Sequence, residues 1–271
     1  AAIMACKITG IQSLGVMTDM PGLMVRFERE QRLPWRTRIA TGIIKWCLNN
    51  FKKYVFLTEA MNVVNERKRP YIVMEGMSDR FMATYKRPFE AKDIKVVMYA
   101  GGLHERYGLK KLTEAFMMLP QENFRLKLFG SGPFVEKLKT KYTKKDSRIQ
   151  YMGVAPNAEV VAAELDASLL VNPRPTHEEF TKYSFPSKNI EYMASGTPLL
   201  TTKLPGMPKE YYPYVFLIEN ESVEGYAKAL ESVLAQSDEE LYVFGEKAKD
   251  FVLEKKNSFE QAKRVIELIK L

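Results

Sequence analysis

From residue 95 onward, the hydrophobic and polar positions follow two patterns that alternate along the chain. Strand patterns recur at 96–100, 124–129, 149–152, 168–171, 198–202 and 215–218, most as short apolar runs and the one at 124–129 as an alternation of apolar and basic residues. Between these runs, apolar residues return at helical spacing, as Leu109, Leu112 and Phe116 do. Repeated strand–helix–strand units form parallel sheets with helices on both faces. The sequence therefore predicts an α/β fold with a mostly parallel sheet.

Turn and capping residues mark the ends of the predicted helices. Pro133 suits the first turn of a helix, and Asn157 suits an N-cap. Gly196 suits the end of the helix that begins at Ser187. Three further helical stretches close the chain, at 223–236, 238–255 and 259–271. The later part of the chain thus alternates strands and helices and then ends in helices.

The first 90 residues hold fewer elements of the same kind. The pattern predicts strands at 13–18, 54–58 and 71–74 and a basic amphipathic helix at 35–50. A doubly wound domain of typical size needs about 100–150 residues. We therefore expect this first lobe to be incomplete at its N-terminal side.

The pattern divides the chain into three parts. We predict a partial N-terminal Rossmann-like lobe at 1–91 and a C-terminal Rossmann-like domain at 92–255. Residues 256–271 form a last helix that we expect to return to the first lobe. A stretch of mixed charge with Pro88, at 85–93, is the predicted linker.

Composition is that of a folded, water-exposed domain. Hydrophobic residues make up 46% and charged residues 27% of the 271 residues. No apolar run reaches the roughly 20 residues that a membrane-spanning helix needs. The first residues carry no secretion signal, and Cys6 and Cys47 are too few for a disulfide framework. We therefore predict a cytoplasmic location.

Positive charge is concentrated in the first lobe. Residues 1–91 hold 15 Lys and Arg against 8 Asp and Glu, whereas the rest holds 26 against 25. Such asymmetry suggests a lobe that faces an anionic partner, such as a membrane, a nucleic acid or a polyanionic acceptor. A solvated basic surface without a partner explains the charge equally well.

Glycines follow several predicted strands. Gly101-Gly102 ends the run at 96–100, and Gly130-Ser131-Gly132 ends the run at 124–129. In open parallel sheets, ligands bind in the crevice beyond the carboxyl ends of the strands. These loops and the helix that begins at Ser187 therefore point to one crevice.

The segment Ser184–Glu191 combines two kinds of recognition. A helix N-terminus offers free amides and a positive dipole end, which suit phosphate, and Lys188 adds a charge. Glu191 follows one turn later on the same side, where its carboxylate can accept hydrogen bonds from a ribose diol. This pair predicts a site for a nucleoside diphosphate. The alternative is that Pro186 starts a helix, Lys188 is solvated, and Glu191 stabilises the first turn.

Other chemistries lack their residues. Val135 stands where a dinucleotide fingerprint needs its third glycine. His104 and His177 are the only histidines, and no Cys/His cluster has metal spacing. No Ser/His/Asp arrangement is visible. We therefore expect no cofactor and no metal.

Four motifs resemble a known family. They are Tyr99-Ala100-Gly101-Gly102-Leu103, Leu128-Phe129-Gly130-Ser131-Gly132-Pro133, Tyr151-Met152-Gly153 and Glu191-Tyr192-Met193-Ala194-Ser195-Gly196-Thr197-Pro198. In order and spacing they resemble the C-terminal domain of retaining GT-B glycosyltransferases of family four, especially those of capsular and exopolysaccharide biosynthesis. The resemblance implies two Rossmann-like lobes facing a cleft, the second for a nucleotide sugar and the first for the acceptor.

The resemblance also implies roles for residues. Glu191 matches the second Glu of a paired-Glu motif and would hold the ribose. The turn at 184–188 would meet the diphosphate, and Gly153 and Val154 fall near the base. The expected donor-binding residues are Gly101, Gly102, Arg106, Gly130, Ser131, Gly153, Val154, Ser184, Phe185, Ser187, Lys188 and Glu191.

Three positions depart from the family pattern. Tyr183 replaces the first Glu of the pair, and the usual basic residues fall on Gly102 and Tyr107. Arg106 or Lys188 would then neutralise the diphosphate. The family histidine of the first lobe falls on Thr18, so we expect Asp19 and Lys188 as catalytic residues. Asp19 would orient the acceptor, or it is an ordinary turn residue at a strand end.

The basic first lobe adds a prediction about location. Arg36, Arg38, Lys45, Lys52 and Lys53, together with Trp35, could seat the lobe on the inner face of a membrane that carries a lipid-linked acceptor. For Trp46 we expect packing on the lobe's own sheet.

Three functions remain open from the sequence. The first is transfer of a sugar from a nucleotide sugar, with UDP as the expected nucleotide, to a glycan or lipid-linked acceptor, without a nucleic-acid partner. The second is a non-catalytic remnant that binds nucleotide sugars. The third is another GT-B enzyme, such as a nucleotide-sugar epimerase.

Overall fold

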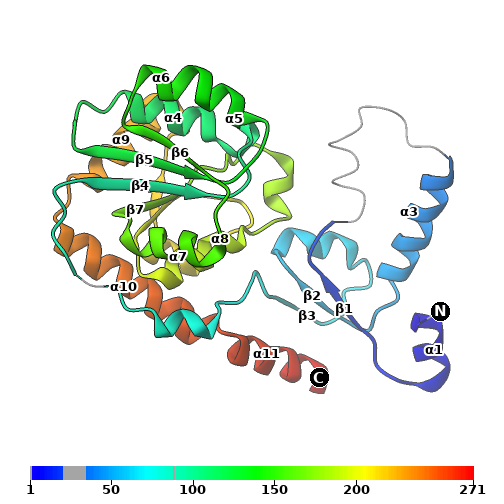
Figure 1. Ribbon diagram of the computed structural model, residues 1–271. Helices are drawn as coiled ribbons and strands as arrows, with labels where there is room; N and C mark the ends of the chain where they lie inside the picture. Colours follow the sequence, from blue (N-terminus) through cyan, green and yellow to red (C-terminus); the bar gives the residue numbers. More distant parts are fainter. Residues whose placement is uncertain (1, 21–34, 88) are drawn as a thin grey trace.

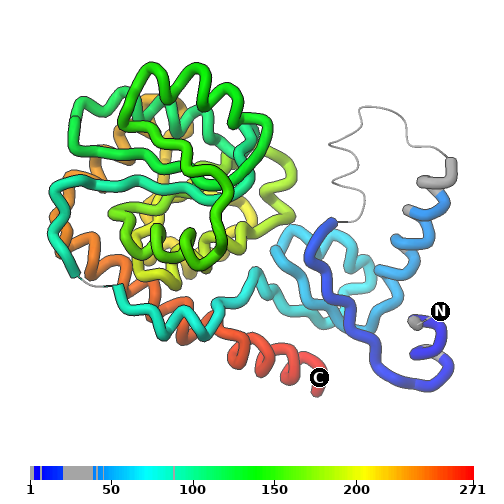
Figure 2. The backbone as a smooth tube through the Cα atoms, viewed as in Figure 1, coloured from blue at the N-terminus to red at the C-terminus, as the bar shows by residue number. Residues whose placement is uncertain are grey.

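The chain forms two parallel sheets, each with its own helices (Figure 1). This computed structural model describes residues 2–20, 35–87 and 89–271. Figure 2 follows the backbone through both parts. The predicted α/β fold with parallel sheets is confirmed. No helix in the described ranges is both long and apolar enough to cross a membrane.

The first sheet has three parallel strands in the order β1-β2-β3. Its strands are β1 (Leu14–Met17), β2 (Lys53–Phe56) and β3 (Tyr71–Val73). Helices α1 (Ala2–Thr9) and α3 (Trp35–Leu48) precede β1 and β2, respectively. A small core forms around Met17, Tyr54 and Phe56, in which the rings of Tyr54 and Phe56 stack at 5.2 Å.

Helix α3 is more exposed than the sequence suggested. Ile39, Ile43 and Ile44 are all exposed, and Trp46 keeps 46% of its surface in contact with solvent. The prediction that Trp46 packs on its own sheet is therefore wrong, because the helix turns its apolar residues outward. The side chains of residues 35–38 and 45 lie outside the described set.

The second sheet has six parallel strands in the order β6-β5-β4-β7-β8-β9. The strands are β4 (Lys95–Ala100), β5 (Phe124–Phe129), β6 (Ile149–Gly153), β7 (Leu169–Asn172), β8 (Leu199–Thr202) and β9 (Phe216–Ile218). The chain starts at β4, winds outward to β6, and then returns to the other side of β4 with β7. The order thus reverses between β4 and β7, which is where ligands bind in doubly wound sheets.

Helices cover both faces of this sheet (Figure 1). The helices are α4 (Leu109–Met117), α5 (Phe134–Lys137), α6 (Thr143–Lys145), α7 (Asn157–Asp166), α8 (Ser187–Ser195), α9 (Val223–Leu234) and α10 (Asp238–Lys255). Alternate residues of β4 point to opposite faces, so Val97 joins the core beneath α4 and α9, and Met98 joins the core beneath α8 and α10. Asn157 is the first residue of α7, and Pro156 holds the capping position without a side-chain bond, so the predicted Asn157 cap is wrong.

The last helix, α11 (Ser258–Lys270), lies against the first sheet. Arg264 donates a hydrogen bond to the Val73 carbonyl at 2.8 Å, and Gln261 donates to the Gly76 carbonyl at 2.9 Å. Lys53 of β2 donates back to the Ile269 carbonyl at 2.7 Å. The chain therefore leaves the second sheet along α10 and ends on the first.

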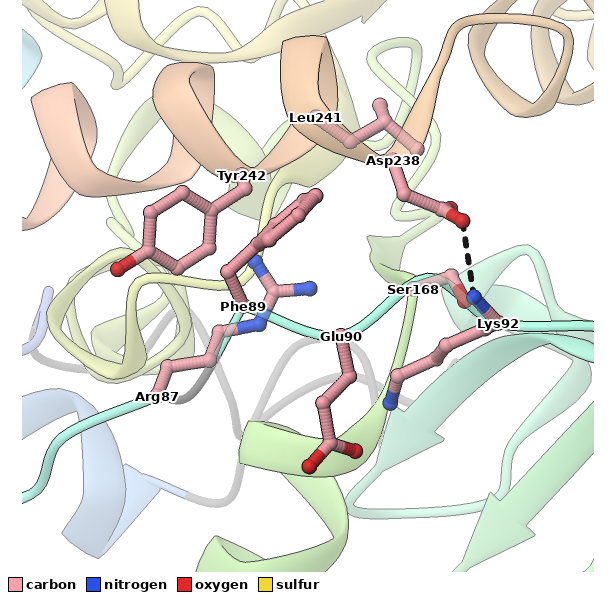
Figure 3. Close-up of a pocket in the computed structure, with 8 residues that line it drawn as sticks. All are labelled: Arg87, Phe89, Glu90, Lys92, Ser168, Asp238, Leu241 and Tyr242. Carbon is pink, nitrogen blue, oxygen red and sulfur yellow. Dashed lines mark hydrogen bonds between the residues drawn. The ribbon is translucent and has the colours of Figure 1, made fainter.

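Arg87 and Phe89, in the predicted linker at 85–93, pack against the helices of the second sheet (Figure 3). Arg87 donates to the carbonyls of Leu165, Ala167 and Gly196 at 3.1 to 3.3 Å. The ring of Phe89 meets that of Tyr242 edge to face at 5.5 Å. The hydrogen bonds of Arg87 and the ring contact of Phe89 thus hold the predicted linker against the second sheet's helices.

Candidate functional site

An open cleft of about 230 Å³ lies beyond the carboxyl ends of β4 and β5, between α7 and α8. It is lined by Ala100, Gly101, Phe129, Gly130, Val154, Ala155, Asn157, Val160, Glu164, Lys188 and Glu191. Five of the predicted donor residues meet here, namely Gly101, Gly130, Val154, Lys188 and Glu191. The cleft adjoins the point where the strand order reverses, so it occupies the expected place for a ligand.

Two glycines form the floor of this cleft. A Cβ on Gly130, whose φ is +123°, would lie 1.8 Å from the carbonyl oxygen of Gly101. A Cβ on Gly101, whose φ is +150°, would lie 2.5 Å from Cε and 2.7 Å from Nζ of Lys188. At Gly130 both the space and the backbone conformation require glycine, whereas at Gly101 the backbone conformation favours it and a side chain would displace the end of Lys188. The floor is therefore bare backbone, and the Lys188 ammonium lies directly on it.

Lys188 is a half-buried cation on the first turn of α8. Burial lowers its pKa, while the carboxyl groups of Glu191 and Glu164 act in the opposite direction. No ion pair joins it to another described residue. A desolvated ammonium of this kind gains free energy when an anion enters the cleft.

The N-terminus of α8 is uncapped. Pro186 occupies the capping position and forms no side-chain bond to the helix. The first amides of any α-helix lack an acceptor within the helix. The Asn189 amide donates to the Pro186 carbonyl at 2.9 Å, so the amides of Ser187 and Lys188 are those that suit an anion. Ser187 at this end is exposed, whereas Phe185 is buried against the ring of Tyr211 at 5.1 Å. Phe185 thus fixes the turn from beneath and cannot contact a ligand with its ring.

A buried acid that sequence reasoning missed lies at the side of the cleft. Glu164 of α7 is 1% exposed, and its Oε2 atom has no hydrogen-bond partner. Burial first, and then the charge of the nearby Glu191, raise its pKa to about 8, although Lys188 acts in the opposite direction. At neutral pH its carboxyl is therefore mostly protonated, and it can donate as well as accept a hydrogen bond. The only sequence signal was an acid placed among apolar helix positions.

Arg174 is a second residue that the sequence did not reveal. It follows β7, and its guanidinium lies over the rings of Tyr107 and Phe180 at 5.1 and 5.4 Å. Its Nη1 is 3.4 Å from Oγ of Ser184, in the turn that precedes α8. A Pro-Arg pair after a strand carries no recognisable motif, so only the fold connects it with the site.

The other predicted residues lie outside the cleft lining. Arg106 is exposed, with its guanidinium over the Tyr107 ring at 5.3 Å. Asp19 is exposed in the turn after β1, on the first sheet. Gly102, Ser131 and Ser184 lie in adjoining loops, Gly153 ends β6 and Ser187 begins α8, and none of them lines the cavity.

No group of His, Cys, Asp or Glu residues in the described ranges is arranged to hold a metal ion. His104 lies against the ring of Tyr107 at 5.1 Å, and His177 is exposed beside Glu178 and Glu221. What the cleft offers is therefore amides, one ammonium and carboxyl groups, which is a polar set for a phosphorylated, hydroxyl-rich ligand.

A six-stranded parallel sheet with this order and a crevice at its reversal defines a Rossmann-like domain of the nucleotide-binding class. Residues 83–269 match the sequence family described as "Glycosyl transferases group 1", and the chain belongs to this family. A search of curated protein sequences found no match.

Solved structures with the same fold include three glycosyltransferases of GT-B type. Sucrose-phosphate synthase from Thermosynechococcus elongatus is 18% identical with a TM-score of 0.70, and the match covers 95% of this chain and 67% of that chain. HepE from Anabaena, in complex with UDP and glucose, is 13% identical with a TM-score of 0.70 and coverages of 99% and 74%. A TarM variant from S. aureus, in complex with fondaparinux, alpha-GlcNAc-glycerol and UDP, is 15% identical with a TM-score of 0.69 and coverages of 96% and 51%.

These similarities establish the GT-B fold predicted from the sequence. The chain spans 67% of the synthase chain but only about half of the TarM chain, at 51%. The family and the fold thus follow from sequence and structure together.

Proposed function

We propose that this chain acts in the retaining transfer of a sugar from a nucleoside diphosphate sugar, with UDP as the nucleotide, to a glycan or lipid-linked acceptor. The proposal includes the family-four type of glycosyltransferase and a role in cell-surface polysaccharide biosynthesis. Among similar folds, HepE is seen with UDP and glucose, and TarM with UDP and glycans. These neighbours support the chemical class of the donor.

One observation carries the proposal. Lys188 and Glu191 lie one helical turn apart on α8 and line the same cleft at the carboxyl ends of the strands. The ammonium and the uncapped helix N-terminus favour the diphosphate, whereas the carboxylate of Glu191 favours the ribose hydroxyls. Val154 and Asn157 lie across the cleft on the side of β6 and α7, where the base would lie.

The chemistry requires little of the protein beyond placement and charge. The bond between the sugar's anomeric carbon and the diphosphate oxygen breaks, and a bond to the acceptor oxygen forms on the same face. The acceptor proton passes to an oxygen of the leaving diphosphate. Lys188 and the α8 amides then stabilise the charge that develops on the diphosphate. Asp19 of the first lobe would orient the acceptor hydroxyl.

The division of labour follows the two sheets. We assign the acceptor to the partial lobe at 1–91, the donor to the domain at 92–255, and the bridging role to the helix at 256–271. The remaining predicted donor contacts, through Gly102, Arg106, Ser131, Gly153 and Ser184, belong to the loops and the end of β6 around the cleft. We expect the donor to approach these residues as it fills the space beyond the strand ends.

A peripheral membrane contact is part of the proposal. The first lobe carries the excess of positive charge, and α3 exposes Ile39, Ile43 and Trp46. Apolar and basic residues on one surface helix suit the interface of an anionic membrane. This would place the chain in the cytoplasm at the inner membrane face, near a lipid-linked acceptor.

Donor turnover tests the proposal and does not require the natural acceptor. The chain is incubated with UDP-hexoses, and release of UDP and free sugar is followed, because water can replace the acceptor. We expect slow hydrolysis that falls by roughly 100-fold in Lys188→Met, since the leaving diphosphate loses a charged contact. Lys182→Met, which changes an exposed lysine shortly before α8, is the matched control and should leave the rate unchanged.

Each competing function gives a different result. A non-catalytic remnant would bind UDP but release no sugar from any donor. An epimerase would convert one UDP-sugar into another without loss of the sugar. Release of the sugar with inverted anomeric configuration, read by NMR, would contradict the retaining assignment.

A further inference from the structure

Arg174 is a cation that lies beside two aromatic rings, which also contact each other edge to face. Its guanidinium carbon lies 5.1 Å from the ring centre of Tyr107 and 5.4 Å from that of Phe180. A guanidinium attracted to aromatic rings makes no hydrogen bond with them, so its N–H groups remain for other acceptors. The guanidinium of Arg174 can therefore bind a ligand through its in-plane N–H groups, two of which can donate to two oxygens of one oxyanion.

This charge has no acidic partner among the described residues. Its only hydrogen bond there is the long one, of 3.4 Å, from Nη1 to Oγ of Ser184, and its Nε is buried without a partner. Burial lowers the pKa of Arg174, and the charge of Arg106 lowers it further. A desolvated guanidinium whose N–H groups lack acceptors costs free energy, and an anion that accepts from those groups offsets this cost.

The position of Arg174 links it to the α8 end of the cleft. Ser184, its hydrogen-bond partner, belongs to the turn that leads into α8. The charge of Arg174 also contributes to lowering the pKa of Lys188. The two cations therefore repel each other near the N-terminus of α8. Such an arrangement becomes favourable when an anion of more than one charge lies between them.

We propose that Arg174 is the second cation of the donor site and binds the terminal phosphate of the nucleoside diphosphate through its in-plane edge, opposite Lys188. This inference rests on the proposed function and names a residue for it. It replaces Arg106 as the expected neutralising arginine, because Arg106 is exposed, whereas Arg174 is desolvated and lies beside the turn that leads into α8. Neither arginine lines the described cavity, so Arg174 would meet the part of the diphosphate that extends toward Ser184.

The test compares a nucleoside diphosphate with its monophosphate, which isolates the terminal phosphate. UDP, UMP, GDP and GMP are titrated by calorimetry into the full chain and into Arg174→Met. We expect the ratio of diphosphate to monophosphate affinity to fall roughly tenfold to hundredfold, as for the loss of charged hydrogen bonds. Arg125→Met, at the opposite end of β5, is the matched control and should keep the wild-type ratio.

A second variant keeps the test valid if the stacked site does not tolerate methionine. Arg174→Lys retains the charge but loses the planar fork, so the ratio should still fall several-fold. Unchanged ratios in the folded variants would overturn the role of Arg174 alone, whereas a wild-type chain that binds neither UDP nor GDP would overturn the proposed function.

Two further results would assign the charges differently. A lower ratio in Arg106→Met but not in Arg174→Met would give the terminal phosphate to Arg106. A variant of Arg174 that loses affinity for UDP-glucuronate but not for UDP-glucose would show that Arg174 binds a sugar carboxylate. Either result would contradict the inference.

Discussion

At the scale of single residues, the cleft contains two ionisable side chains, Lys188 and Glu164, that are removed from water without a full set of bonding partners. Lys188 lies on the backbone of Gly101, and Glu164 lies in the α7 wall with a free carboxyl oxygen. The pKa of Lys188 is lowered and that of Glu164 is raised, in both cases chiefly by burial. Both groups are thus shifted toward their neutral forms, which ties the charge of the cleft to pH.

Glu164 gives the stability of the chain a specific pH dependence. Its pKa rises from the ordinary value of 4.5 to about 8 on folding, so the folded chain keeps a proton that the unfolded chain releases. The contribution of Glu164 to the free energy of unfolding should therefore be fully present below about pH 4.5. It should be lost as pH rises toward about 8, by at most about 1.4 kcal/mol per pH unit. Thermal unfolding of wild type and Glu164→Gln between pH 5 and 9 measures this.

The glutamine variant cannot titrate, so it should become relatively more stable as pH rises. Glu159→Gln, on the exposed side of α7, should follow the wild-type profile. Parallel profiles for wild type and Glu164→Gln would show that Glu164 is charged in the folded chain.

The sequence revealed some residues of the site and concealed others. Lys188 and Glu191 were predictable because their relation is local, fixed by one turn of one helix. Glu164 and Arg174 were not, because they reach the site only when α7 and the loop after β7 pack beside α8. Asp19 and Arg106 looked suitable by position in a motif, yet they lie in exposed turns outside the cleft lining.

At the scale of elements, the strand ends of β4 and β5 approach each other so closely that side chains cannot fit. The amide of Gly101 donates to the Phe129 carbonyl at 3.0 Å, and the amide of Gly130 donates to the Gly153 carbonyl at 2.7 Å. These bonds extend the pairing of β4, β5 and β6 into the loops that follow the strands and fix the backbone at the floor of the cleft. The glycines were visible in the sequence, but the contact between the two loops was not.

Gly130→Ala should damage this junction. Its Cβ would lie 1.8 Å from a carbonyl oxygen, in a backbone conformation that alanine rarely adopts. We expect a loss of at least about 2 kcal/mol in the free energy of unfolding, measured in urea. Gly42→Ala in α3 meets no atom within 4 Å and should instead stabilise the chain by up to about 1 kcal/mol. Equal stability of Gly130→Ala and wild type would contradict the described loop contact.

At the scale of the whole molecule, a buried ion pair joins the two sheets near the α10–α11 boundary. Lys256 and Glu75 are 4% and 2% exposed, and their charged atoms are 2.5 Å apart. Tyr211 donates to Glu75 at 2.6 Å, and Lys256 also reaches Glu210 at 2.6 Å. The amide of Ser78 donates to the Lys256 carbonyl. A backbone hydrogen bond and an ion pair thus connect the segment after β3 to the same crossing, the point where the chain passes from α10 to α11.

Lys256→Met tests this crossing. The change leaves the Glu75 carboxylate buried without a cation, which should cost about 3–5 kcal/mol of unfolding free energy. The double variant Lys256→Met with Glu75→Gln removes both charges and should regain most of the loss. Equal stability of the single and double variants, measured in urea, would show that the pair does not hold the crossing.

The overall architecture was predictable to a large extent. The alternation of strand patterns and helical spacing predicted the parallel sheets, because strands covered on both faces are largely apolar. The pattern placed Trp46 on the sheet, and here it failed, because an amphipathic period shows that a helix has an apolar side but not what covers it. For Trp46 the described structure leaves that side half exposed.

The central claim is that the cleft beside α8 binds a nucleoside diphosphate through Lys188 and Glu191. Calorimetric titration of UDP and GDP into the folded chain tests it most directly, with Glu191→Ala and the exposed control Glu159→Ala beside the wild type. We predict that UDP binds at one site and that its affinity falls roughly tenfold or more in Glu191→Ala, because two ribose hydrogen bonds to a charged group are lost. The affinity should stay unchanged in Glu159→Ala. No binding of either nucleotide, or equal affinity in Glu191→Ala, would contradict it.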